Sequence, residues 1–308
     1  MVDLSIQLAP THKRGLLLAN PVMTASGTFG YGIEYSELVD IQRLGAIVCK
    51  GTTLKPREGN PQPRLVETAW GIANSVGLEN AGVEAVIKDK APTWAKWQVP
   101  VIVNIAGDTI DEYVDVAARL DGVAGVSGIE VNISCPNIKS GGMEFGTNPE
   151  SAAEVTAAVK AVSSLPVIVK LSPNVTDIGQ IALAVSEAGA DAITLINTVQ
   201  VMAIDTKERR PLLGNFVGGL SGPAIKPIAL YIVYKVAGIV DIPIIGCGGI
   251  SCADDALEFL MAGASAVQVG TANLANPQAA LDVLDGIKRF IKRENLKNME
   301  TIVGKART

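Results

Sequence analysis

The sequence of 308 residues contains one histidine, His12, and few aromatic residues, which make up 4% of the chain. Its cysteines, Cys49, Cys135, Cys247 and Cys252, show no paired C-x-x-C spacing. The sequence therefore argues against a zinc site, an iron–sulfur centre or a disulfide framework in this chain.

Long apolar runs and basic blocks are also missing. No stretch approaches the roughly 18 unbroken apolar residues of a membrane span, and the N-terminus lacks the pattern of a signal peptide. A formal net charge of −5 without a basic cluster gives no electrostatic basis for binding nucleic acid or an anionic membrane. We expect a soluble, cytoplasmic protein.

What the chain does have is apolar residues, at 48%, and glycine, at 31 residues. This composition suits a large core of Val, Ile, Leu and Ala joined by many tight turns. The length allows one large domain or two ordinary ones. No segment resembles a linker, so a single domain over residues 1–308 is expected.

Apolar strand-like segments alternate with helix-length segments along the chain. Eight strands are expected, at 22–25, 46–50, 99–106, 128–134, 166–171, 192–198, 242–248 and 266–270. Helices are expected at 34–43, 80–95, 109–121, 149–164, 177–188, 223–239, 252–262 and 277–293. The pattern predicts an α/β fold, a (β/α)8 TIM barrel, with a doubly wound open sheet as the alternative.

Two further features fit a barrel. Residues 3–8 and 15–19 predict a short N-terminal β-hairpin that contains His12. The segments 51–79 and 199–221 are too long for ordinary connections, and long loops after barrel strands usually form the active-site face.

Polar residues gather where the expected strands end, on the face where barrel enzymes carry their sites. Lysines and asparagines inside apolar strands are costly to bury without partners, so their convergence on one rim predicts a site. The rim residues in strand order are Ala25, Ser26, Lys50, Asn104, Asn132, Cys135, Lys170, Asn197, Thr198, Gly248, Gly249, Gly270 and Thr271.

The loops after the last two strands predict an anion site. Gly248 and Gly249 follow the seventh strand, and Gly270 and Thr271 follow the eighth. Backbone N–H groups beside glycine, together with a helix N-terminus, bind phosphate well. This is the usual phosphate position of barrel enzymes, although the glycines could instead serve only tight turns.

A flavin mononucleotide would use both the phosphate loops and the polar rim. Lys170 suits the pyrimidine edge of the flavin ring, where a cation stabilises the reduced form. Cys135 follows a buried strand and precedes a loop with Gly141, Gly142 and Gly146, which could act as hinges. It is the candidate proton-transferring group, although a packing role remains open for it, and a packing role is expected for Cys247.

Several motifs then resemble class 1 dihydroorotate dehydrogenases over essentially the whole chain. They are Asn132-Ile133-Ser134-Cys135-Pro136-Asn137, Asn74-Ser75-Val76-Gly77-Leu78, Lys170-Leu171-Ser172-Pro173 and Asn197-Thr198. The segments at 139–146 and 217–224 resemble the NAD-linked class 1B catalytic subunit, and Cys135 stands where the membrane-bound class 2 enzymes carry serine.

The resemblance implies oxidation of dihydroorotate to orotate in pyrimidine synthesis, with hydride transfer to FMN and Cys135 as the base. The residues implied for FMN are Ser26, Lys50, Gly51, Asn104, Asn132, Lys170, Ile196, Gly222, Gly248, Gly249, Gly270 and Thr271. Those implied for the substrate are Lys50, Asn74, Ser75, Val76, Gly77, Leu78, Asn132, Asn197 and Thr198.

The electron acceptor needs a second chain if it is NAD. No G-x-G-x-x-G fingerprint follows a strand, so a dinucleotide site would lie elsewhere. The resemblance implies a partner subunit with FAD and a [2Fe-2S] cluster, in a heterotetramer of two catalytic and two electron-transfer chains. The alternatives are a fumarate-using class 1A homodimer, a non-redox lyase or isomerase acting on a sugar phosphate, and a barrel that serves only as a binding subunit.

Overall fold

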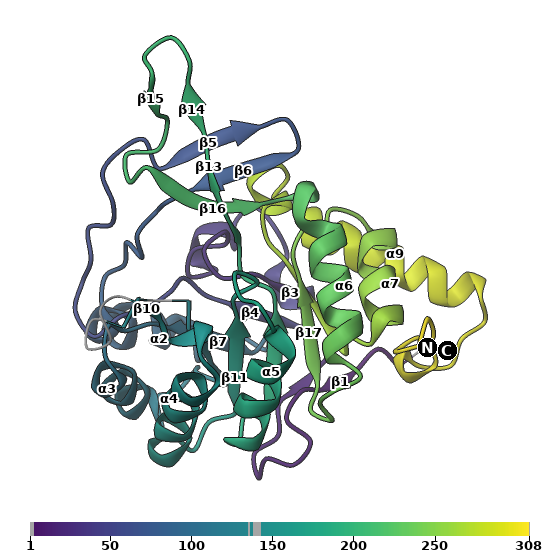
Figure 1. The fold of residues 1–308 in the computed structure, drawn as a ribbon. Helices are drawn as coiled ribbons and strands as arrows, with labels where there is room; N and C mark the ends of the chain where they lie inside the picture. The colour runs from purple at the N-terminus through teal and green to yellow at the C-terminus, as the bar shows by residue number, and fades with distance from the viewer. Residues whose placement is uncertain (1–2, 135, 138–142, 308) are drawn as a thin grey trace.

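The computed structural model describes residues 3–134, 136–137 and 143–307, and its centre is a closed barrel of eight parallel strands (Figure 1). Each expected strand is present, and the expected (β/α)8 barrel is confirmed. The barrel strands are β3 (Val22–Thr24), β4 (Ala46–Val48), β7 (Val101–Ile105), β8 (Gly128–Asn132), β11 (Val167–Leu171), β12 (Ala192–Leu195), β17 (Ile244–Cys247) and β18 (Ala266–Val269). Their near-continuous apolar runs are explained by burial on both faces of the sheet.

Helices surround the barrel and bury their apolar faces against it (Figure 1). Most begin and end within a few residues of the expected bounds. They are α1 (Val83–Ala85) and α2 (Ala91–Trp94), joined by a π-helical segment at Val86–Lys90, then α3 (Ile110–Leu120), α4 (Pro149–Val162), α5 (Ile178–Glu187), α6 (Lys226–Val236), α7 (Ala253–Ala262) and α9 (Ala279–Arg293). Asn148 caps α4 as its side chain accepts from the Ser151 N–H at 3.0 Å.

The helix expected at 34–43 is wrong. The segment instead holds two 3-10 turns, Ile33–Tyr35 and Ile41–Arg43. Asp40 has a ψ of 81°, outside the helical region, and it separates the two turns. The short helix α8 (Ala272–Ala275), which follows β18, was not expected from the sequence.

The two long segments after barrel strands form an antiparallel sheet rather than irregular loops. Its strands, in spatial order, are β13 (Val199–Met202), β16 (Val217–Ser221), β6 (Gly71–Asn74) and β5 (Leu65–Thr68). A small hairpin of β14 (Ile204–Asp205) and β15 (Arg210–Pro211) extends from it. Figure 1 shows this sheet to one side of the barrel, beyond the ends of its strands. The sheet covers the end of the barrel at which the carboxyl ends of the strands meet.

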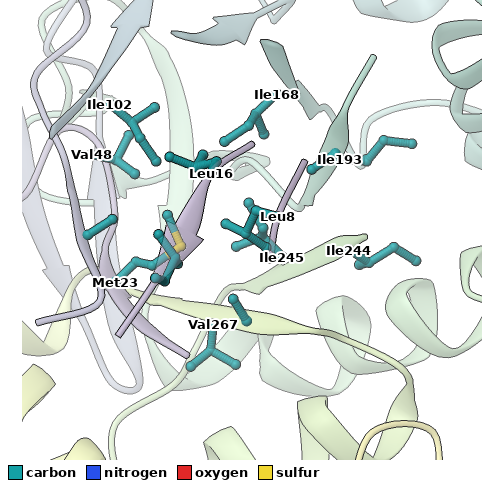
Figure 2. Packing of buried hydrophobic residues seen from close by; sticks show 14 of the residues in the cluster. Leu8, Leu16, Met23, Val48, Ile102, Ile168, Ile193, Ile244, Ile245 and Val267 are labelled. Carbon is teal, nitrogen blue, oxygen red and sulfur yellow. The ribbon is translucent and has the colours of Figure 1, made fainter. Parts of the chain in front are cut away.

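The N-terminal hairpin is present as β1 (Ile6–Gln7) paired with β2 (Leu17–Leu18). It closes the opposite end of the barrel: Leu16 lies beside Gly128, the first residue of β8, and Leu8 is fully buried (Figure 2). His12 lies at this end, near Asp191, which precedes β12. Burial and the nearby Lys160 and Arg14 lower the pKa of His12, and Asp191 opposes them.

Among the described residues, no helix has both the length and the apolar character needed to cross a bilayer.

Candidate functional site

A cavity of about 1170 Å³ opens at the carboxyl ends of the barrel strands and under the antiparallel sheet. Its lining brings together every candidate site residue that the structure describes. These are Ser26, Lys50, Gly51, Asn74, Ser75, Val76, Gly77, Leu78, Asn104, Asn132, Lys170, Ile196, Asn197, Thr198, Gly222, Gly248, Gly249, Gly270 and Thr271. Cys135, the candidate base, lies outside the described residues. The sequence therefore predicts which residues share this cavity, while their roles stay predictions.

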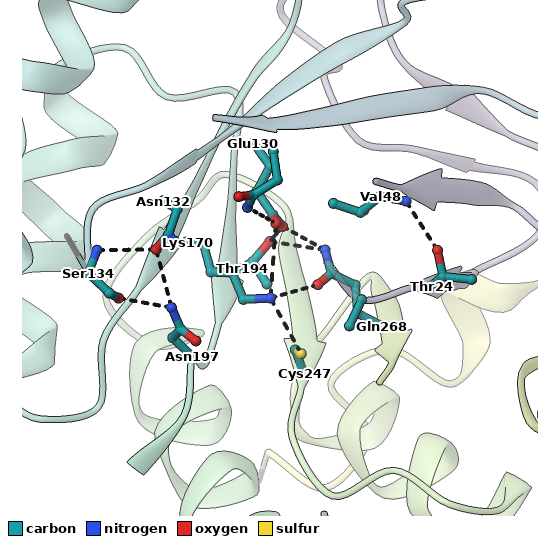
Figure 3. A network of polar contacts seen from close by, with 12 residues as sticks. Thr24, Val48, Glu130, Asn132, Ser134, Lys170, Thr194, Asn197, Cys247 and Gln268 are labelled. Atoms are coloured by element: carbon teal, nitrogen blue, oxygen red, sulfur yellow. Dashed lines mark hydrogen bonds and ion pairs between the residues drawn. The ribbon is translucent and has the colours of Figure 1, made fainter. Parts of the chain in front are cut away.

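Glu130 organises a polar network beneath the cavity, inside the barrel (Figure 3). The side chain is fully buried. Asn104 Nδ2 donates to its Oε1 at 2.8 Å, while Thr194 Oγ1 and Gln268 Nε2 donate to its Oε2 at 2.8 and 2.7 Å. Lys170 Nζ lies 4.0 Å from Oε1. The network joins strands β7, β8, β11, β12 and β18 through one carboxylate.

Lys170 is only 4% exposed and lines the cavity. Its Nζ donates to Gln268 Oε1 at 3.2 Å and to Cys247 Sγ at 3.8 Å. Burial alone would lower the pKa of Lys170, but Cys247 and Glu130 raise it above its usual value. Because burial raises the pKa of the Cys247 thiol, that thiol is protonated at neutral pH, and Glu130 is the group that keeps the lysine charged.

Amide and hydroxyl groups cluster beyond the ends of β8 and β12. Asn197 Nδ2 donates to Asn132 Oδ1 at 3.2 Å and to Ser134 Oγ at 3.0 Å. The Ser134 N–H donates to the same Asn132 oxygen at 3.2 Å, and the Thr198 N–H donates to Asn197 Oδ1 at 2.8 Å. Ser134 lines the cavity and was missed as a site residue, although it stands within the motif that identified its neighbours.

The segment from Asn74 to Leu78 crosses the cavity from the end of β6. Asn74 Nδ2 donates one of its two hydrogens to Gly219 O at 2.9 Å. Gly77 has a φ of +75°, and a Cβ there would lie 2.5 Å from the side chain of Asn60. Only glycine therefore lets this segment pass so close to its neighbour.

The loop after β17 is fixed by a carboxylate rather than by an open helix end. Asp255 Oδ2 accepts from the N–H groups of Ser251 and Cys252 at 2.8 and 3.1 Å and from Ser251 Oγ at 2.7 Å. Lys226 Nζ donates to its Oδ1 at 2.7 Å. The N–H groups of Ser251 and Cys252, the two residues that precede α7, are thus already bonded to this carboxylate.

The backbone available to an anion is instead the glycine segment of this loop and the turn after β18. Gly248 and Gly249 have φ values of +127° and +76°, and a Cβ at Gly249 would lie 2.7 Å from Lys226. A Cβ at Gly270 would lie 3.2 Å from the Ala25 side chain. Both loops line the cavity, and α8 follows the second one.

The expected hinge glycines divide into two groups. Gly141 and Gly142 lie outside the described residues, as does the first half of the segment at 139–146. Gly146 is buried; its N–H donates to Ile133 O at 2.8 Å, and a Cβ there would lie 3.0 Å from that residue. Close packing explains this glycine.

Sequence reasoning also missed three polar residues that lie below the cavity lining: Glu130, Thr194 and Gln268. The spacing of Glu130 and Asn132 was a usable signal. The two residues are two positions apart in an apolar strand, so their side chains point to the same face of the sheet. Asn174 was missed as well; its Nδ2 donates to Thr198 O at 3.1 Å at the cavity edge.

Asp255 gives a pH-dependent prediction. Burial would raise the pKa of this carboxyl, but hydrogen bonds from Lys226, Ser251 and Cys252 lower it to about 2. A lowered folded-state pKa means stability that is present above the unfolded value of 3.8 and is lost as pH falls through about 2. We expect Asp255→Asn to cost about 2 kcal/mol of unfolding free energy at pH 5. Urea unfolding should show this difference shrinking as the pH is lowered towards 2; a difference independent of pH would contradict the assignment.

The comparisons with known proteins agree with one another. The family model described as dihydroorotate dehydrogenase matches residues 9–291. The catalytic subunit of dihydroorotate dehydrogenase B (NAD(+)) from Desulforamulus reducens is 57% identical over 289 residues, covering 94% of this chain and 95% of that relative. The same subunit from Desulforudis audaxviator is 56% identical over 292 residues, 95% of each chain, and that from Pelobacter propionicus is 53% identical over 302 residues, 98% of each chain. The chain belongs to the dihydroorotate dehydrogenase family.

Proposed function

We propose that this chain is the FMN-containing catalytic subunit of an NAD-linked dihydroorotate dehydrogenase. It oxidises (S)-dihydroorotate to orotate in pyrimidine (UMP) synthesis, and residues 1–308 act as one cofactor-binding barrel domain. The observation that carries the proposal is the single cavity that unites two glycine loops, the buried Lys170 and a cluster of side-chain amides. The names of relatives at 53–57% identity over nearly the full chain support the same activity.

The lining fits FMN. The close-packed glycines at 248, 249 and 270 leave backbone exposed where a phosphate would be held. Lys170 supplies a buried positive charge for the pyrimidine edge of the ring, and Asn104 supplies an amide beside it. The other residues that would hold the cofactor are Ser26, Lys50, Gly51, Asn132, Ile196, Gly222 and Thr271. FMN, when bound, supplies the acceptor for the substrate hydride at its N5 atom.

The substrate is a cyclic diamide that carries a carboxylate, and the remaining lining suits both parts. Lys50 offers a positive charge for the carboxylate. Asn74 offers an amide that can donate and accept a hydrogen bond. Asn132 offers its amide N–H groups, because its oxygen already accepts from Ser134 and Asn197, and Asn197 offers its oxygen, because both of its N–H groups are bonded. Ser75, Val76, Gly77, Leu78 and Thr198 complete this side of the cavity.

Cys135 is the proposed base, taking the substrate C5 proton on its Sγ. It follows Asn132 and Ser134, both of which line the cavity. His12 lies at the other end of the barrel, so it is not available to this cavity. Base catalysis of this kind contributes roughly 100- to 10,000-fold to a rate.

A partner chain completes the electron path in this proposal. It carries FAD and a [2Fe-2S] cluster, passes electrons to NAD, and assembles with this chain as a cytoplasmic heterotetramer of two catalytic and two electron-transfer chains. The relatives are named catalytic subunits, which supports the existence of a second subunit.

The direct test is anaerobic addition of dihydroorotate to the purified chain. We expect a yellow protein whose flavin absorbance is bleached by dihydroorotate and restored by an oxidant. A colourless protein that does not take up FMN would contradict the proposal, as would a flavin that dihydroorotate leaves oxidised.

Gly249→Ala tests the phosphate loop. The added methyl group would lie 2.7 Å from Lys226 at a φ of +76°, so the loop must shift. Gly122→Ala is a matched control, because Gly122 has a φ of +74° with nothing within 4 Å of a Cβ. Gly122→Ala should lose about 1 kcal/mol of stability and Gly249→Ala more, because of the clash, but only Gly249→Ala should weaken FMN binding, by about tenfold or more. Equal FMN affinity in the two variants would show that this loop does not hold the cofactor.

Cys135→Ser tests the base. Serine keeps the size of the side chain but is a far weaker base than a thiolate, so flavin reduction by dihydroorotate should slow by about 100-fold or more. Orotate affinity should change much less. Stopped-flow reduction and orotate titration measure the two quantities; equal losses in both would assign Cys135 to substrate holding instead.

The acceptor separates the NAD-linked enzyme from a fumarate-using homodimer. Dihydroorotate-dependent reduction of NAD should require the partner chain, and fumarate should not support turnover of the isolated chain. Turnover with fumarate alone, and none with NAD after the partner is added, would replace the NAD-linked assignment with the fumarate-linked one.

A further inference from the structure

Glu130 does not belong to the cavity lining, yet it bonds to groups that do. Its carboxylate is fully buried in the barrel, one layer below Lys170 and Asn104. Thr194 and Gln268, its other two donors, also lie below the lining. Both carboxylate oxygens therefore accept hydrogen bonds, from side chains on three other barrel strands, and Lys170 on a fourth strand lies 4.0 Å from Oε1.

An ionised carboxylate can only accept hydrogen bonds, so it determines how each neighbouring amide is turned. Asn104 must present Nδ2 to Glu130, which leaves its Oδ1 as an acceptor on the cavity side, near Gly51. Gln268 must likewise present Nε2 to Glu130, and its Oε1 then accepts from Lys170. The cavity floor consequently offers an acceptor from Asn104 beside a charged donor from Lys170.

This pair of groups matches the pyrimidine edge of an isoalloxazine ring, where an N–H stands next to a carbonyl. The charge on Lys170 depends on Glu130, because the other groups that face the lysine are a neutral amide, Gln268, and a buried thiol, Cys247.

A contribution to folding stability alone does not explain the buried Glu130–Lys170 pair. Replacing a buried ion pair by apolar groups of similar volume is often neutral or stabilising, whereas removing one partner costs about 3–5 kcal/mol. The rest of the barrel interior is packed with apolar side chains. Apolar residues could therefore fill the positions of Glu130 and Lys170 in this fold.

We propose that Glu130 is a positioning residue that holds Lys170 as a charged donor and Asn104 as an acceptor for the pyrimidine edge of the bound flavin. The assignment rests on the proposed function, since it presumes that FMN occupies the cavity. Glu130 itself touches neither cofactor nor substrate; it acts through the two side chains that it orients.

The test is Glu130→Gln, read out by the pH dependence of the midpoint potential of bound FMN from about pH 7 to 9. In the parent protein Lys170 stays charged, so two-electron reduction takes up one proton. In the variant, burial without a counter-charge lowers the pKa of Lys170, and the neutral lysine takes up a second proton when the flavin gains charge. The potential of the variant should therefore fall with pH about twice as steeply.

Asp191→Asn is the matched control. Asp191 is also buried and paired with a lysine, Lys160, at 2.8 Å, but it lies at the opposite end of the barrel. Its loss should reduce stability and leave the pH slope of the potential at the parental value. A change of slope in both variants, or in neither, would overturn the positioning role of Glu130.

A second variant keeps the test decisive if Glu130→Gln does not fold. Glu130→Gln combined with Lys170→Met removes both charges. This double variant should fold, and its urea unfolding midpoint should be higher than that of Glu130→Gln. If the double variant does not fold either, the carboxylate is needed independently of the lysine, and the proposal falls. Failure of the parent protein to bind FMN would reject the proposed function instead, which keeps the two results apart.

Discussion

The interaction on which the site depends is an ion pair that is buried inside the barrel. Lys170 and Glu130 stand on the adjacent strands β11 and β8, surrounded by apolar strands, with Nζ and Oε1 4.0 Å apart. An unpaired charge in this position would cost several kcal/mol. Pairing removes most of that cost, and Asn104, Thr194 and Gln268 donate hydrogen bonds to the carboxylate. The remaining exposed face of the lysine is the one that lines the cavity.

The barrel explains why residues far apart in sequence share that cavity. Eight parallel strands end at one rim, so each strand delivers its last residues to the same place. The antiparallel sheet of β5, β6, β13 and β16 then covers the opening and carries the segment 74–78 across it. The N-terminal hairpin packs the buried Leu8 and Leu16 against the other end (Figure 2). The cavity therefore lies at the rim, and the apolar layers beneath it form the core.

The barrel and the convergence of the candidate residues on one cavity could be predicted from sequence because both follow local patterns. Apolar runs that end in polar or glycine residues identify the strands, and parallel order places their ends together. The roles of Glu130 and Gln268 could not be predicted, because their bond joins positions separated by 138 residues and depends on barrel register. The helix expected at 34–43 failed for a local reason, the backbone of Asp40. The antiparallel sheet was missed because glycine- and proline-rich segments give weak strand patterns.

The proposed arrangement is a charged donor from Lys170 beside an acceptor from Asn104, both held by Glu130 under a bound flavin ring. A crystal structure of the chain with FMN and orotate tests it most directly. The ring should lie over these two residues, with its pyrimidine edge within hydrogen-bonding distance of Lys170 Nζ and Asn104 Oδ1, and with Asn104 Nδ2 still bonded to Glu130. A ring bound elsewhere in the cavity, or a Lys170 that no longer faces Glu130, would contradict it.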